Sequence, residues 1–119
     1  MEEFRDLDEW IGALKGSGCL IIVEGKRDRA SLLDIGIRAE IIELSSKALF
    51  QVVEEVAGKA KKVVILTDLD KEGKRLYSIL RRGLLERGVH VDNVFREWLF
   101  KNTKLRQIEG FHKYLLKHE

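Results

Sequence analysis

The chain alternates between two kinds of apolar pattern. Segments with apolar residues every three or four positions predict helices over residues 3–15, 27–35, from Ser45 or Ser46 to about Val56, and 71–87. Short runs rich in β-branched residues predict strands over residues 20–23, 39–44, 63–66 and 89–95. Strands that alternate with helices predict an α/β fold with a mainly parallel, four-stranded sheet flanked by helices.

The ends of the chain extend this alternating core. We expect residues 1–119 to form one domain, with a core over about residues 19–95 and a helical C-terminal extension over residues 96–119. The extension contains aromatic and basic residues that could stack on nucleic-acid bases. Their helical spacing favours a helix that packs back on the sheet instead.

Composition excludes several classes of protein. No apolar run approaches the roughly 18 residues of a membrane span. The first six residues are acidic and polar, so we expect no secretory signal peptide and a cytoplasmic location. Cys19 is the only cysteine, which rules out an internal disulfide and a cysteine-rich zinc site.

Charge is informative in its distribution rather than in its total of +2. Residues 1–70 contain 10 Lys and Arg against 14 Asp and Glu, whereas residues 71–119 contain 12 against 6. This asymmetry suits a phosphate-binding surface beside a cluster of metal-binding carboxylates. A solvated surface of ordinary ion pairs would have the same composition, so charge alone leaves both interpretations open.

Acidic residues follow two of the predicted strands. Glu24 comes directly after the first strand, and Asp68, Asp70 and Glu72 follow the third. Ligands of parallel sheets bind at the carboxyl ends of the strands, and neighbouring strands would bring these carboxylates together. Like charges gathered at one edge favour a bound cation, and oxygen ligands without nearby His or Cys favour Mg²⁺, or Mn²⁺ as the alternative ion.

The Asp-x-Asp pattern has other interpretations when it is taken alone. It occurs in haloacid-dehalogenase-type phosphatases, in sugar-nucleotide transferases and as helix-capping aspartate. The phosphatase pattern calls for a small hydroxyl or β-branched residue where this chain has Glu72. The purely structural alternatives are a helix-capping acid at Glu24 and an Asx turn at Asp68 and Asp70.

The two acidic motifs together are more specific. Residues 22–28 read IVEGKRD and residues 65–73 read ILTDLDKEG, each at the end of a predicted strand. In order, spacing and strand context this pair resembles the Toprim domain, over residues 19–95. Within that family the first motif is most similar to the small proteins related to the 5S ribosomal RNA maturation nuclease and to the Toprim domains of bacterial primases. The resemblance implies a Rossmann-like Toprim fold.

The resemblance also implies roles for single residues. Glu24 matches a metal ligand or proton-transfer residue, and Asp68 and Asp70 match the magnesium-binding pair. Glu72, which is similar to the third acid of the topoisomerase pattern, is a further candidate ligand. The matching glycines, Gly25 and Gly73, would let the backbone turn tightly and bring its amides near a phosphate. Independently, a glycine near a helix start costs stability, so Gly73 needs a reason such as close backbone approach.

Basic residues surround both motifs and are candidates for phosphate contact. Asp28 completes the first motif and is predicted to support this group. The basic candidates are Lys26, Arg27, Arg29, Lys71, Lys74 and Arg75.

Two functions follow from these observations. The first is a Mg²⁺-dependent enzyme acting on nucleic-acid phosphodiesters, as a nuclease or RNA-processing phosphotransferase, with Glu24, Asp68 and Asp70 as catalytic residues. The alternative is a non-catalytic, metal-dependent nucleic-acid-binding module that works with a protein partner in a larger replication, repair or RNA-processing complex. The sequence leaves RNA and DNA equally open as the nucleic-acid partner.

Overall fold

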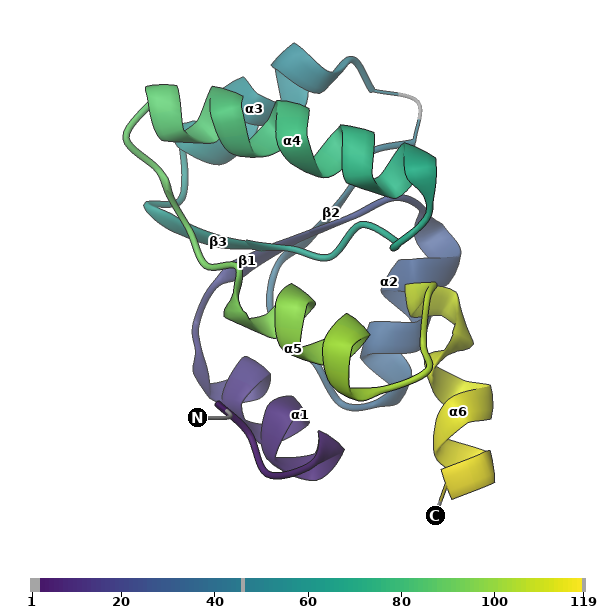
Figure 1. The fold of residues 1–119 in the computed structure, drawn as a ribbon. Helices are drawn as coiled ribbons and strands as arrows, with labels where there is room; N and C mark the ends of the chain where they lie inside the picture. Colours follow the sequence, from purple (N-terminus) through teal and green to yellow (C-terminus); the bar gives the residue numbers. More distant parts are fainter. Residues whose placement is uncertain (1–2, 46, 119) are drawn as a thin grey trace.

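The computed structural model describes residues 3–45 and 47–118, and its elements alternate between helix and strand (Figure 1). In chain order they are α1 (Leu7–Gly16), β1 (Leu20–Val23), α2 (Lys26–Asp34), β2 (Ile41–Glu43), α3 (Leu49–Ala57), β3 (Lys62–Ile65), α4 (Lys71–Glu86), β4 (His90–Val91), α5 (Val94–Asn102), the 3₁₀ turn η1 (Ile108–Gly110) and α6 (Phe111–His118). The strands form one sheet in the order β2-β1-β3-β4, and every pairing is parallel. The predicted α/β fold is therefore confirmed.

Helices cover both faces of the sheet. Figure 1 shows α3 and α4 on one face, with α1, α2, α5 and α6 on the other. Side chains alternate along a strand, so Leu20 and Ile22 of β1 pack in the core beneath α3 and α4. Ile21 and Val23 of the same strand join the core on the opposite face. The uninterrupted apolar run of β1 is therefore explained by burial on both faces.

Aromatic side chains from both ends of the chain pack together on one face of the sheet. The Trp10 indole Nε1 donates to the backbone oxygen of Phe95 (2.9 Å), and its ring lies 5.5 Å from that of Phe111. The Trp98 Nε1 donates to the backbone oxygen of Phe4 (3.1 Å). Trp98 and Phe111 are buried, which confirms that these aromatics of the C-terminal extension pack on the core.

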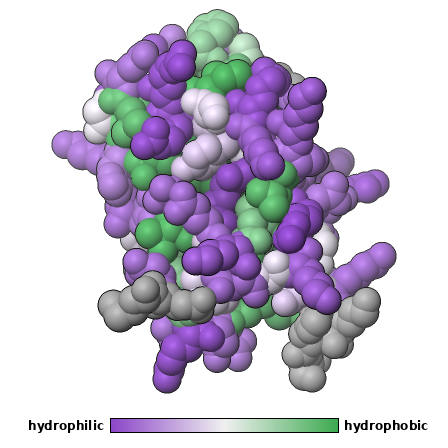
Figure 2. All heavy atoms as spheres, viewed as in Figure 1, coloured by the Kyte–Doolittle hydropathy of each residue, from purple (hydrophilic) through white to green (hydrophobic). Residues whose placement is uncertain are grey.

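The exterior is mostly polar. Figure 2 shows hydrophilic side chains over most of the visible face, with small apolar areas between them. None of the described helices is long and apolar enough to cross a membrane.

Two predicted boundaries were wrong, one at the first helix and one at the fourth strand. The first helix begins at Leu7 rather than residue 3, because Asp6 caps it by accepting a hydrogen bond from Glu9 N (2.9 Å). The fourth strand ends at Val91 rather than residue 95. The carboxylate of Asp92 accepts from Val94 N (3.1 Å), and the chain turns there into α5.

The prediction that Ser45 caps the third helix was also wrong. The helix begins at Leu49 with Ala48 at its N-cap, so Ser45 precedes it by several residues. Ser46, the alternative cap, lies outside the described residues. The end of the longest helix agrees better with the prediction: Gly88 follows α4 with φ of +76°, a backbone conformation that favours glycine.

Candidate functional site

Two of the predicted acids meet where neighbouring strands end. β1 pairs with β3 in a register that places Ile22 beside Ile65, so the loops that follow both strands leave the sheet together. Asp68 N donates to Glu24 Oε2 (2.7 Å), a contact between residues 44 positions apart. The sheet topology therefore joins the two sequence motifs directly.

Burial and neighbouring charge favour the protonated forms of these acids. Asp68 is buried, and burial raises its pKa to about 6. A hydrogen bond from Ile108 N (2.9 Å) opposes that rise, whereas the charges of Asp28, Asp70 and Glu109 add to it.

Glu24 follows the same pattern. Burial raises the pKa of this carboxyl, and the hydrogen bond from Asp68 N lowers it. The charges of Asp68, Asp70 and Glu72 raise it further.

The other two predicted acids are engaged locally. Asp70 is exposed and caps α4, because its Oδ1 accepts from Gly73 N (2.7 Å). Glu72 points its carboxylate to Arg75 in an exposed ion pair, and this pairing lowers its pKa. Among the side chains that the structure describes, no three from His, Cys, Asp or Glu are arranged as a group that could hold a metal ion.

The donor set nevertheless suits a hard divalent cation. Glu24, Asp68 and Asp70 each have one oxygen bound by a backbone N–H, and a carboxylate has a second oxygen that can serve as a ligand. Asp70 also raises the pKa of both other acids, so the three carboxylates repel one another. A cation would relieve that repulsion, and these three residues could serve as its ligands.

The two motif glycines have distinct structural reasons. A Cβ on Gly73 would lie 2.0 Å from the backbone oxygen of Asp68, so only glycine fits this close approach. Thr67 reinforces it by donating its hydroxyl to the backbone oxygen of Gly73 (2.8 Å). Gly25 N donates to Asp28 Oδ2 (3.0 Å) at the start of α2. Both glycine amides are thus bonded to capping carboxylates, and their contact with phosphate stays a prediction.

An acidic cavity of about 730 Å³ opens beside Glu24 and Asp68. We define it by its lining residues, which are Glu24, Gly25, Lys26, Arg27, Asp28, Glu43, Ser45, Asp68 and Glu109. Lys26 and Arg27 are exposed cations in its wall, which suits an anionic ligand beside the carboxylates.

The remaining basic candidates do not line this cavity. Arg29 pairs with Glu43 (3.6 Å), which does line it. Lys71, Lys74 and Arg75 lie exposed on the first turns of α4, outside the cavity wall. The structure therefore separates Lys26 and Arg27 from the other four.

Two residues that the motifs did not indicate also belong to the site. Arg96 is buried and donates from Nε to the Thr67 backbone oxygen (2.9 Å) and from Nη2 to that of Asp68 (2.8 Å). Its guanidinium lies 4.7 Å from the Tyr77 ring centroid. Glu109, from η1, lines the acidic cavity together with Glu24 and Asp68. An arginine within the mainly apolar segment FREWLF (residues 95–100) is the only local signal for Arg96, and Glu109 has none.

We expect Arg96→Lys to lower the free energy of unfolding by about 2 kcal/mol, because a lysine ammonium cannot reproduce the forked pair of hydrogen bonds. Chemical denaturation of both proteins measures the change. Lys101→Arg, at an exposed position of the same helix, is the control and should leave stability unchanged. A variant as stable as the parent would show that the two bonds contribute nothing.

Comparisons with known proteins agree with this geometry. The Toprim domain family matches residues 19–95, the same range over which the sequence resembles it. A UPF0292 protein of Pyrococcus abyssi is 39% identical over 109 residues, covering 92% of this chain and 81% of that protein. A UPF0292 protein of Methanocaldococcus jannaschii is 32% identical, covering 82% of this chain and 78% of its own length.

A solved structure has the same fold. The structure of a putative protein from Aquifex aeolicus superposes with a TM-score of 0.81 at 38% identity, covering 88% of this chain and 97% of that one. Toprim domains in general bind divalent metal and act on nucleic acids. The match implies this general function and nothing more specific. With two motifs, a parallel sheet and a match over residues 19–95 in agreement, the chain belongs to the Toprim domain family.

Proposed function

We propose that this protein is a divalent-metal-dependent nuclease or phosphotransferase that acts on nucleic-acid phosphodiesters at the acidic cavity. The observation that carries the proposal is the hydrogen bond from Asp68 N to Glu24, which unites both motifs in one cavity wall. The cations of Lys26 and Arg27 in the same wall support an anionic substrate.

Each residue has a chemical task in this proposal. A bound divalent cation would polarise a phosphoryl oxygen and stabilise charge on the attacking and leaving oxygens. Glu24, Asp68 and Asp70 would hold it. Because burial raises its pKa, the Glu24 carboxyl is also suited to exchange a proton with an attacking hydroxyl or water. Lys26 and Arg27 would hold the phosphate backbone.

The proposal predicts metal-dependent cleavage of at least one nucleic acid. The purified protein would be incubated with labelled single-stranded and duplex RNA and DNA, in Mg²⁺, Mn²⁺ or EDTA, and the products separated by gel electrophoresis. We expect products only with metal, and their loss in Glu24→Gln. Glu86→Gln, an exposed carboxylate at the far end of α4, is the matched control and should retain cleavage. Cleavage that persists in Glu24→Gln would contradict the assignment.

One observation favours a second function. Asp70 caps α4 and Glu72 pairs with Arg75, so the described part of the chain holds no preformed group of three metal-binding side chains. This arrangement fits a binding module that completes its metal site only with a partner. Salt-sensitive, metal-dependent nucleic-acid binding without products would support this function, and multiple turnover by the pure protein would exclude it.

A further inference from the structure

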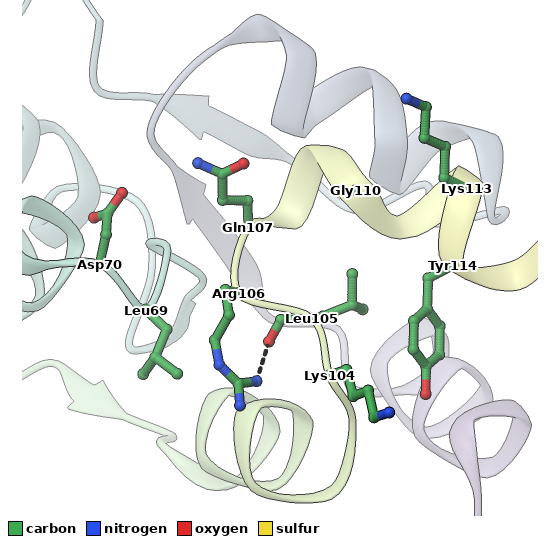
Figure 3. A pocket seen from close by; sticks show the side chains of 9 residues that line it. All are labelled: Leu69, Asp70, Lys104, Leu105, Arg106, Gln107, Gly110, Lys113 and Tyr114. Atoms are coloured by element: carbon green, nitrogen blue, oxygen red, sulfur yellow. Dashed lines mark hydrogen bonds between the residues drawn. The ribbon is translucent and has the colours of Figure 1, made fainter.

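A second cavity, of about 600 Å³, lies between the loop that follows β3 and the segment that joins α5 to α6 (Figure 3). We call it the C-terminal pocket, and the residues that matter here are Leu69, Asp70, Lys104, Leu105, Lys113 and Tyr114. Its volume is within the range of pockets that bind small ligands or single groups of larger ones.

Neighbouring residues of the same two segments line this pocket and the acidic cavity. In the first segment Asp68 lines the acidic cavity and Asp70 lines the pocket. In the second, Glu109 lines the cavity and Gly110 the pocket. Leu69 N donates to the backbone oxygen of Arg106 (2.8 Å) and holds the two segments together. The two cavities therefore flank the same pair of hydrogen-bonded segments.

The lining combines apolar and cationic groups. Leu69, Leu105 and Tyr114 supply apolar surface, and Tyr114 is half-buried. Lys104 and Lys113 are exposed, and neither forms an ion pair within residues 3–45 and 47–118. In Figure 3 Tyr114 and Lys104 lie toward one end of the pocket and Asp70 toward the other. Such a lining complements a flat apolar group attached to an anion.

Most of this lining lies outside the family match. The match ends at residue 95, whereas Lys104, Leu105, Lys113 and Tyr114 come from the C-terminal extension. The pocket is thus built by joining the extension to the loop that carries Asp70.

We propose that the C-terminal pocket binds one unpaired nucleotide of a single-stranded nucleic acid. The inference rests on the proposed function, because the adjoining phosphodiester would occupy the acidic cavity. The base would pack on Tyr114 and the two leucines, and Lys104 and Lys113 would attract the flanking phosphates. A base can enter such a pocket only after leaving its stack, so the preferred substrate is single-stranded or locally unpaired.

Binding without cleavage tests this proposal. Fluorescence anisotropy with Ca²⁺ in place of Mg²⁺ would compare labelled oligouridylate and oligothymidylate with a duplex of equal length. We expect the protein to prefer the single strands, and Tyr114→Leu and Lys104→Gln each to weaken that binding by about tenfold while duplex binding changes little. Tyr114→Phe retains the ring and should bind like the parent. Lys101→Gln, an exposed lysine of α5 outside the pocket, is the matched control.

Several results would overturn the proposal. They are parent-like binding of single strands by Tyr114→Leu, equal losses for duplex and single strand, and an equal loss in Lys101→Gln. If Tyr114→Leu fails to fold by circular dichroism, Lys104→Gln decides, because its side chain is exposed. Single-strand preference in a protein that cleaves nothing would contradict the proposed catalysis while supporting the pocket. Cleavage without single-strand preference would support the proposed catalysis and contradict the pocket proposal.

Discussion

Replacing Asp68 by asparagine is expected to lower metal-dependent cleavage by about a hundredfold or more, and to stabilise the metal-free protein. The loss follows because an amide is a poor ligand for a hard cation and carries no charge. The stabilisation follows because the Asp68 carboxylate is buried near Asp28 and Asp70, which raise its pKa further. Asparagine retains a side-chain oxygen that can accept from Ile108 N.

The gain in stability should depend on pH in a defined direction. Between about pH 4 and the folded-state pKa of about 6, the native protein holds a proton on Asp68 that the unfolded chain releases. Native stability contributed by this group therefore falls as pH rises through that window. Asp68→Asn lacks the titration, so its advantage should be near zero at about pH 4 and reach about 2 kcal/mol above about pH 7.

Thermal unfolding measures the predicted gain in stability. Calorimetric metal titration measures the loss of metal binding that underlies the predicted loss of cleavage. Mg²⁺ should raise the melting temperature of the parent protein and have little effect on Asp68→Asn, because only the parent binds the ion. Glu86→Gln provides the matched loss of an exposed carboxylate and should behave like the parent. Equal Mg²⁺ responses in the parent and Asp68→Asn would remove Asp68 from the metal site, independently of any cleavage assay.

Replacing Gly73 by alanine is expected to lower the free energy of unfolding by at least about 3 kcal/mol. The new Cβ would lie 2.0 Å from the oxygen, 2.6 Å from the carbon and 2.9 Å from the nitrogen of the Asp68 backbone. Backbone atoms cannot swing aside as a flexible side chain can. The loop must shift, which also disturbs the hydrogen bond from Thr67 and the cap that Asp70 forms on α4.

Gly12→Ala is the matched control for this substitution. Gly12 lies in the interior of α1, and a Cβ there would meet nothing within 4 Å. Alanine should therefore raise the free energy of unfolding, by up to about 1 kcal/mol, because it favours the helix. Denaturant titration of both variants distinguishes the crowded glycine from the open one. Equal stability of Gly73→Ala and the parent would show that the loop does not approach the helix as described.

The close approach at Gly73 links fold and site. It brings the first turn of α4 against the loop that holds Asp68, while Arg96 supports the same loop by donating hydrogen bonds to two consecutive carbonyl oxygens. The position of the Asp68 carboxylate is thus determined by backbone contacts that do not involve the carboxylate itself. Changes at Gly73 or Arg96 should consequently alter metal affinity as well as stability.

The sequence by itself determined the elements whose signals lie in consecutive residues. The apolar runs at 20–23 and 63–66 identified β1 and β3, because burial on both faces demands apolar residues at every position. Parallel strands end at the same edge of a sheet, so the acids directly after each run are assigned to that edge by their position in the chain alone. Local signals were weaker at residues 89–95, where a single capping bond from Val94 N to Asp92 ends the strand early.

Only the tertiary structure decided which distant groups complete the site. Ile108 N bonds Asp68 across 40 residues, Arg96 reaches the same loop across 28, and Glu109 enters the acidic cavity from the C-terminal extension. These contacts depend on how α5 and η1 pack against the sheet, and no spacing along the chain encodes that packing. The C-terminal pocket has the same origin, because its two walls lie more than thirty residues apart in the sequence.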